Sequence, residues 1–135
     1  MSETPTSSSG PAMGDHDALL RSNLDGVFNE REAGRRAAGV AALYVADPVM
    51  YEPDAVVSGR TAIAEVAGRL QVQFGPDFRF VPVGRATGHH GIACLRWQAG
   101  PAAGPVVVTG ADVAEIVEGR IARLWVLLDP PPAAD

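Results

Sequence analysis

Residues 106–128, with the sequence VVVTGADVAEIVEGRIARLWVLL, decide the fold. The three valines at the start are β-branched and favour an extended strand. Glu118 and Gly119 suit a tight turn, and an almost continuously apolar run follows them. We therefore predict a β-hairpin. The alternative is a helix over residues 111–118, which Gly119 and the β-branched flanks disfavour.

One acidic residue interrupts the apolar pattern of this hairpin. If the first strand alternates, Asp112 shares a face with Val108, Gly110, Ala114 and Ile116. A carboxyl group on an apolar face is costly unless it is protonated, paired or hydrogen-bonded. Asp112 is therefore a candidate functional residue. The alternative is a structural aspartate bound to a neighbouring backbone group or arginine.

Three helices are predicted before the hairpin, each from apolar residues at helical spacing. The first starts at a cap, Asp15 or Asp17, and ends near Glu30. The second covers roughly residues 32–45 and ends at Asp47-Pro48. A short strand over 49–52 and a loop over 54–60 lead to the third helix, residues 61–74.

The remaining chain predicts an antiparallel sheet. Strands over 78–83 and 89–99 are joined by a connection at 84–88, and a loop at 100–105 leads into the hairpin. Helices segregated from such a sheet indicate an α+β fold, with three N-terminal helices packed on a mainly antiparallel sheet. We expect a single domain over residues 15–129, a disordered tail over 1–14 and a C-terminal tail over 130–135.

Composition narrows the function classes. The chain has 135 residues and a formal net charge of −5, which disfavours a partner that is nucleic acid or an anionic membrane. No apolar run is long enough to span a bilayer, and the first residues do not form a secretory signal. A single cysteine cannot form an internal disulfide, so we expect a cytoplasmic protein.

Neither a metal nor a cofactor is predicted. The adjacent His89 and His90 would point to opposite sides of a strand, and no cysteine or acid stands at a zinc-like spacing from them. We expect these histidines near a strand entrance, without a catalytic role. The sequence carries no glycine-rich phosphate loop.

Three segments resemble a known family: LYVADPVMYEP at residues 43–53, SGRTAI at 58–63, and GADVAEIVEGRIARLWVLLD at 110–129. They are similar to the nuclear transport factor two-like superfamily, and within it to the SnoaL-like and ketosteroid-isomerase-like proteins. The resemblance implies a curved sheet that forms a cone with an internal cavity.

The same resemblance implies a site. Glu52, before Pro53, stands where ketosteroid isomerases carry a proton-shuttling aspartate, and Asp112 matches the acid that stabilises the oxyanion. Leu24 stands where that pattern has a tyrosine. We therefore predict Glu52 and Asp112 as catalytic residues. The alternative for Glu52 is a solvated carboxylate in a turn.

A larger set of side chains is predicted to line the cavity and bind substrate. Trp97 could equally be a packed core residue, and a tyrosine at the position of Tyr44 is more often packed in the core than directed into a cavity. The predicted set is Leu24, Phe28, Tyr44, Met50, Val66, Leu70, Leu95, Trp97, Ala114, Leu124, Val126 and Leu128.

The leading functional hypothesis is a cofactor-independent acid–base enzyme of isomerase or cyclase type, acting on a small hydrophobic carbonyl compound in the cone. The alternatives are a non-catalytic module that binds a hydrophobic ligand, and a dimeric interaction domain of the same fold. The outer face of the sheet would carry Val107, Val113, Val117 and Trp125, which is too apolar to leave in water. We therefore expect a homodimer across this face.

Overall fold

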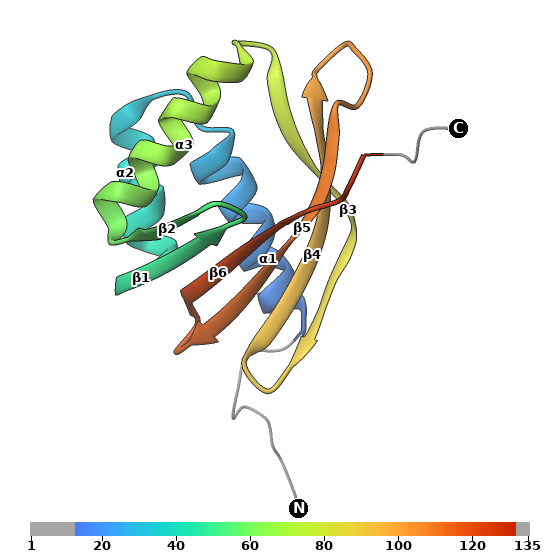
Figure 1. Cartoon of the computed structure of the whole chain (residues 1–135). Coiled ribbons are helices and arrows are strands. Elements are labelled where there is room, and N and C mark those ends of the chain that lie inside the picture. Colours follow the sequence, from blue (N-terminus) through green and yellow to red (C-terminus); the bar gives the residue numbers. More distant parts are fainter. Residues whose placement is uncertain (1–12, 132–135) are drawn as a thin grey trace, which may run out of the picture.

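The computed structural model describes residues 13–131 (Figure 1), with side chains from residue 16 onward. Three α-helices, a π-helical turn and six strands follow one another along this part of the chain. They are α1 (Met13–Asn23), the π-helical turn Leu24–Phe28, α2 (Ala33–Leu43), β1 (Tyr44–Glu52), β2 (Ala55–Ser58), α3 (Arg60–Phe74), β3 (Phe78–His89), β4 (Ile92–Pro101), β5 (Val108–Val117) and β6 (Arg120–Leu128).

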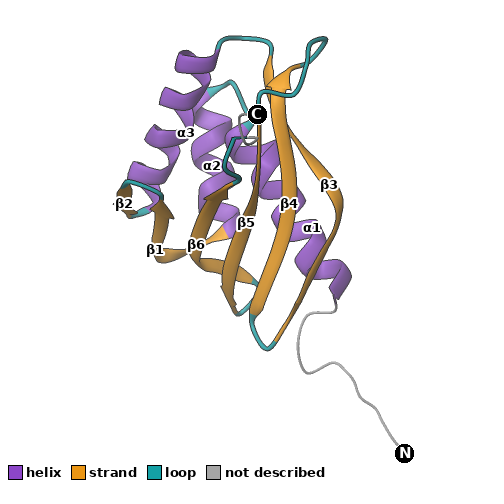
Figure 2. Ribbon diagram, turned by 45° about the vertical axis from the view of Figure 1, so that its right-hand side comes forward, coloured by secondary structure: helices purple, strands orange, loops and turns teal. Residues whose placement is uncertain are grey.

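The strands form one curved, unclosed sheet in the order β2-β1-β6-β5-β4-β3. Only the β1–β6 pair is parallel among the five pairings of the described strands. The helices cover one face of the sheet and leave its other face open (Figure 2). The predicted α+β class is therefore confirmed. Within residues 13–131, no helix is both long and apolar enough to cross a membrane.

The hairpin predicted from residues 106–128 is confirmed. β5 and β6 pair antiparallel, and the turn between them is made by Glu118 and Gly119, whose φ angles are 53° and 80°. The helix considered over residues 111–118 is therefore wrong. Asp112, Ala114 and Ile116 are all buried on the inner face of β5, as strand alternation predicts.

The prediction of an aspartate cap for the first helix is wrong. α1 begins at Met13, so neither Asp15 nor Asp17 precedes it. Asp17 instead lies inside the helix, where its carboxylate accepts hydrogen bonds from the Ala86 backbone nitrogen at 2.7 Å and from Arg21 Nε at 2.8 Å. It ties α1 to β3. Of the tail predicted over residues 1–14, positions 1–12 lie outside the described residues.

The first strand is longer than predicted and gains a partner. The second helix ends at Leu43, so residues 44–48, including Asp47-Pro48, belong to β1 rather than to a helix end. The side chain of Arg60 donates to the backbone oxygens of Tyr44 and Val45 at 2.8 and 2.9 Å, which satisfies these carbonyls where the β1–β6 register shifts. The loop predicted over 54–60 contains β2, which pairs with the end of β1.

The predicted position of the turn between the third and fourth strands is wrong. Gly84 has φ of 73°, but it lies at a shift of register within β3 and not at a strand end. β3 continues to His89, and His90 and Gly91, both with positive φ, make the turn. A glycine in a strand pattern can mark a bulge as readily as a turn, and here the bulge bends β3.

Candidate active site

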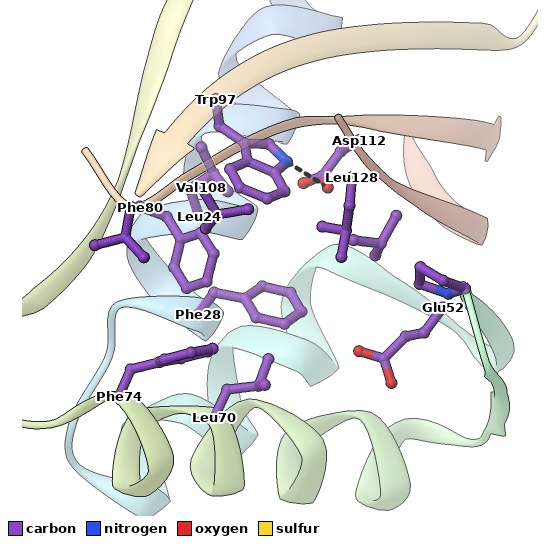
Figure 3. Close-up of a pocket in the computed structure, with 13 residues that line it drawn as sticks. Leu24, Phe28, Glu52, Leu70, Phe74, Phe80, Trp97, Val108, Asp112 and Leu128 are labelled. Atoms are coloured by element: carbon purple, nitrogen blue, oxygen red, sulfur yellow. Dashed lines mark hydrogen bonds between the residues drawn. The ribbon is translucent and has the colours of Figure 1, made fainter. Parts of the chain in front are cut away.

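A pocket of about 200 Å³ opens between the helices and the inner face of the sheet (Figure 3). Eleven of its thirteen lining residues are apolar, and only two are ionisable. The lining consists of Leu24, Phe28, Glu52, Pro53, Leu70, Phe74, Phe80, Trp97, Val107, Val108, Asp112, Val126 and Leu128.

The π-helical turn after α1 builds one wall of the pocket. The backbone nitrogen of Asn29 bonds to the Leu24 oxygen at 2.7 Å, which closes a wider ring than an α-helix would. Leu24 and Phe28 from this turn both line the pocket. The Asn29 side chain then exchanges two hydrogen bonds of 2.8 Å with the backbone of Phe80 on the edge strand β3. This exchange fixes Phe80 opposite Phe28.

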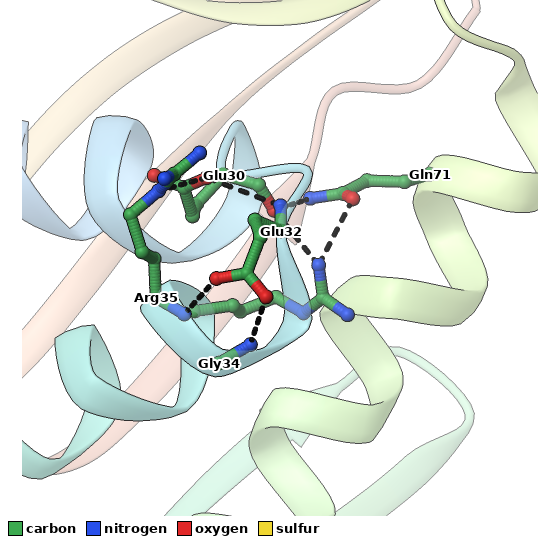
Figure 4. A network of polar contacts seen from close by, with 6 residues as sticks. Glu30, Glu32, Gly34, Arg35 and Gln71 are labelled. Atoms are coloured by element: carbon green, nitrogen blue, oxygen red, sulfur yellow. Dashed lines mark hydrogen bonds and ion pairs between the residues drawn. The ribbon is translucent and has the colours of Figure 1, made fainter.

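A second polar network holds the helices against each other (Figure 4). Gln71 on α3 donates to the backbone oxygens of Phe28 and Glu30 at 2.9 and 2.7 Å. Arg36 on α2 donates to the same Glu30 oxygen at 2.8 Å and to Gln71 Oε1 at 3.2 Å. Glu32 caps α2 through the nitrogens of the following residues. These bonds set the separation between Phe28 and α3.

Asp112 lies at the deep end of the pocket, with only 3% of its surface exposed. Trp97 Nε1 donates to Asp112 Oδ1 at 3.0 Å. The indole reaches across β5 because its neighbour in the register is Gly110; a Cβ there would lie 2.8 Å from the Trp97 ring. Burial raises the pKa of Asp112 to about 7, and the hydrogen bond from Trp97 and the nearby Asn23 amide act in the opposite direction.

Two further buried side chains stand behind Asp112. Tyr44 donates from its hydroxyl to Asn23 Oδ1 at 2.6 Å, and neither residue is exposed. Burial, with a smaller contribution from the Asp112 charge, raises the pKa of Tyr44, so it remains a neutral donor. Among the described residues, Asn23 Nδ2 is one of two buried side-chain polar atoms that have no hydrogen-bond partner. The Asn23 amide lowers the pKa of Asp112, so it favours the carboxylate form.

Glu52 occupies another wall, at the end of β1. It is half-buried and lies on the same side of the strand as the fully buried Met50. Burial raises the pKa of Glu52, with a further increase from the Asp54 charge and a decrease from Arg69. Because Glu52 is less buried than Asp112, the two carboxyl groups face one pocket in different environments.

The structure places the predicted site residues in two groups. Both predicted catalytic carboxyls line the pocket, together with Leu24, Phe28, Leu70, Trp97, Val126 and Leu128. The other predicted lining residues, Tyr44, Met50, Val66, Leu95, Ala114 and Leu124, are buried in the core and do not line it.

Sequence reasoning missed five lining residues: Pro53, Phe74, Phe80, Val107 and Val108. The prediction of Val107 on the outer face of the sheet is wrong, because β5 begins only at Val108 and strand alternation does not extend to Val107. The period-two pattern does place Val108 on the face of Asp112. Nothing in the sequence brings Phe74 and Phe80, from two different elements, to one cavity.

The histidines lie elsewhere. His89 and His90 are both exposed at the β3–β4 turn, where their Nδ1 atoms lie 2.8 Å apart. Neither residue lines the pocket.

Comparison with known proteins identifies the family. Residues 26–124 match the family model of the SnoaL-like domain. The chain therefore belongs to the SnoaL-like family, within the nuclear transport factor two-like superfamily. A comparison with curated proteins gave no match.

Solved structures agree with this assignment. A candidate isomerase of the SnoaL-like family from Agrobacterium tumefaciens is 27% identical, with a TM-score of 0.80 over 87% of this chain and 100% of that one. A candidate polyketide cyclase from Sinorhizobium meliloti is 19% identical, with a TM-score of 0.65 over 85% and 98%. A candidate ketosteroid isomerase from Kribbella flavida is 20% identical, with a TM-score of 0.64 over 90% and 85%. The last two show the fold alone.

Proposed function

We propose that this protein is a cofactor-independent acid–base enzyme of isomerase or cyclase type, acting on a small hydrophobic carbonyl compound. One observation carries the proposal: the only two ionisable residues that line the described pocket, Glu52 and Asp112, differ in burial. Carboxyl groups whose environments separate their pKa values can divide the roles of acid and base. The names of the similar isomerase and cyclase structures agree with this reaction class.

Glu52 is the proposed base. Its pKa is raised by partial burial, which makes the carboxylate a stronger proton acceptor while solvent and Arg69 still favour ionisation. It would remove a proton from a carbon next to the substrate carbonyl and return it to a second position, or leave a carbon nucleophile for ring closure.

Asp112 is the proposed oxyanion donor. Its Oδ1 accepts from Trp97, so Oδ2 would carry the proton when the group is neutral. A neutral carboxylic acid in a dry site can donate to the oxygen of an enolate. Ketosteroid isomerases use the same arrangement, with a donor acid that an apolar site keeps neutral. Because the pKa of Asp112 is about 7, this role should weaken as pH rises through 7.

The test is exchange of the α-protons of a small cyclic ketone in D₂O, followed by NMR. Glu52→Gln should lower the catalysed exchange rate ~100-fold, because it removes the base and keeps its shape. Glu65→Gln, at an exposed position of α3 outside the pocket, is the matched control and should exchange at the wild-type rate. Equal rates in the Glu52 and Glu65 variants would refute the proposed base.

A second candidate function is non-catalytic binding of a hydrophobic ligand in the same pocket. Leu24 favours it, because this residue lines the pocket without the hydroxyl that the ketosteroid-isomerase pattern places there. Binding without any catalysed exchange would support this second candidate.

A further inference from the structure

The size of the pocket limits its ligand. An apolar cavity of about 150 Å³ in another protein admits benzene. The pocket described here has about 200 Å³, so it holds one six-membered ring and a few substituent atoms. A fused four-ring skeleton has three rings more than this volume can hold, so most of it would have to lie outside the pocket.

The walls are held so that they resist widening. Phe28 meets Phe80 edge to face, with ring centroids 6.0 Å apart, and Phe80 meets Trp97 in the same way at 5.3 Å. Phe80 is fixed through its backbone by Asn29, and Trp97 is fixed by its bond to Asp112. These aromatic side chains present ring faces and edges that suit a flat, unsaturated ligand.

Polarity changes along the depth of the pocket. Asp112 lies at the buried end, whereas Phe74, Val107 and Leu128 line the pocket and are 40%, 63% and 50% exposed. We call these three exposed side chains the apolar rim. They come from the end of α3, the loop before β5 and the end of β6. A ligand with one buried oxygen and an apolar group at the opposite end matches both features.

We propose that the pocket binds a single-ring carbonyl or enol compound whose oxygen meets Asp112 and whose apolar substituent leaves across the apolar rim. The reaction of this ligand rests on the proposed function, but its size and orientation rest on the pocket. The ring packs against the wall formed by Phe28, Phe80 and Trp97, on the side of these side chains that faces Asp112 and Leu128 (Figure 3). The substituent opposite the oxygen then points to the mouth, where it covers apolar surface that is otherwise in water.

The probes are phenols, which imitate an enol and do not react. Trp125→Phe leaves Trp97 as the one tryptophan, since the chain has two. The indole N–H resonance of Trp97 then reports binding beside Asp112. Phenol, 4-ethylphenol and 4-butylphenol should bind with affinity rising about twofold to fourfold per methylene, as apolar burial predicts. A four-ring phenol should bind at least tenfold more weakly than 4-butylphenol.

Matched variants separate the rim from the ring site. Leu128→Ser should remove most of the gain from the butyl group and leave the affinity for phenol nearly unchanged. Val72→Ser, at an 85% exposed position of α3 outside the pocket, should change neither affinity. Asp112→Ala should weaken every phenol of the series by a similar factor, because all of them place oxygen at the same end.

Two results would overturn the ligand assignment. One is a four-ring phenol that binds more tightly than 4-butylphenol and shifts the Trp97 resonance. The other is an affinity that does not change with alkyl length. If the phenols bind as expected but the protein does not catalyse proton exchange, the proposed enzymatic role is wrong and the proposed ligand class stands. If a four-ring phenol binds tightly, the proposed ligand class is wrong, and the proposal that Glu52 transfers a proton is unaffected.

Discussion

Replacement of Asp112 by asparagine tests the buried acid without any substrate. The pKa of Asp112 is about 7 in the folded chain, against 3.8 for an ordinary aspartate. Between these values the folded chain keeps a proton that the unfolded chain has lost. Stability therefore falls as pH rises, by about 1.4 kcal/mol per pH unit, and becomes level above pH 7. The full cost of ionising Asp112 in the fold is on the order of 4 kcal/mol.

Asp112→Asn removes this cost. The Asn Oδ1 atom can still accept from Trp97, so the variant keeps the hydrogen bond seen in the fold. The stability of the variant minus that of the wild type should increase by roughly 3 kcal/mol between pH 4.5 and pH 8. Any constant difference between an amide and a neutral acid cancels in this comparison. With ordinary slopes, the urea midpoint difference should change by about 1–2 M.

The assay is urea unfolding followed by circular dichroism at pH 4.5, 6 and 8, at one protein concentration. Asp129→Asn is a control of opposite sign. Hydrogen bonding from Thr109, with help from Arg96, lowers the pKa of Asp129. The ionised Asp129 therefore stabilises the fold above the ordinary pKa of an aspartate, and this stabilisation is lost as pH falls. The Asp129 variant should lose stability at pH 8 rather than gain it. A stability difference for Asp112→Asn that does not vary with pH would refute the buried, protonated acid.

Three further predictions concern the surroundings of the pocket and the open face of the sheet. Gly110→Ala places a Cβ 2.2 Å from the Leu127 backbone oxygen and 2.8 Å from the ring of Trp97, so it should disturb the β5–β6 pairing, displace the indole and cost ~1–3 kcal/mol of stability in urea unfolding; an unshifted Trp97 indole N–H resonance together with an unchanged urea midpoint would contradict this. Tyr44→Phe removes the donor to Asn23 and should cost ~1–3 kcal/mol, measured in the same way, because a buried acceptor loses its partner; an unchanged midpoint would show that the bond contributes nothing. Trp125→Glu should convert the proposed homodimer to monomers or aggregates in light scattering, and an unchanged dimer would reject the outer face as the interface.

The last hairpin could be predicted from sequence because two independent signals agree there. Its β-branched and apolar runs favour strands, and Glu118-Gly119 can adopt the positive φ angles that the turn requires. The same alternation correctly places Asp112 on the inner face. The α+β class follows from the segregation of helical and extended patterns along the chain.

Other predicted element boundaries are wrong where a contact between residues far apart in sequence overrides the local sequence signal. Asp17 has the residue type of a helix cap, yet its carboxylate bonds to Ala86, 69 positions away in sequence. Gly84 has the residue type of a turn, yet pairing of β3 with β4 on both sides of it makes a bulge. Local propensity cannot distinguish these outcomes, because the deciding partner lies on another element.

The pocket lining was predictable only in part for a related reason. A residue on the inner face of a strand can line the pocket or lie in the filled core, and the choice depends on how far the helices stand from that part of the sheet. Leu95 and Trp97 share the inner face of β4, but only Trp97 lines the pocket. The π-helical turn and the Gln71 bonds set that distance, and neither is evident from apolar periodicity.

The roles proposed for Glu52 and Asp112 depend on depth more than on residue type. Both are carboxyl groups, and the sequence marks each by a local feature: one precedes a proline, and the other interrupts an apolar face. The structure adds that the indole of Trp97 crosses Gly110 and closes the deep end of the pocket over Asp112, whereas Glu52 lies near solvent and Arg69. A carboxyl group that is buried with few donors holds its proton longer than one that is half solvated. Closure of the deep end by Trp97 is therefore what would let one carboxyl donate while the other accepts.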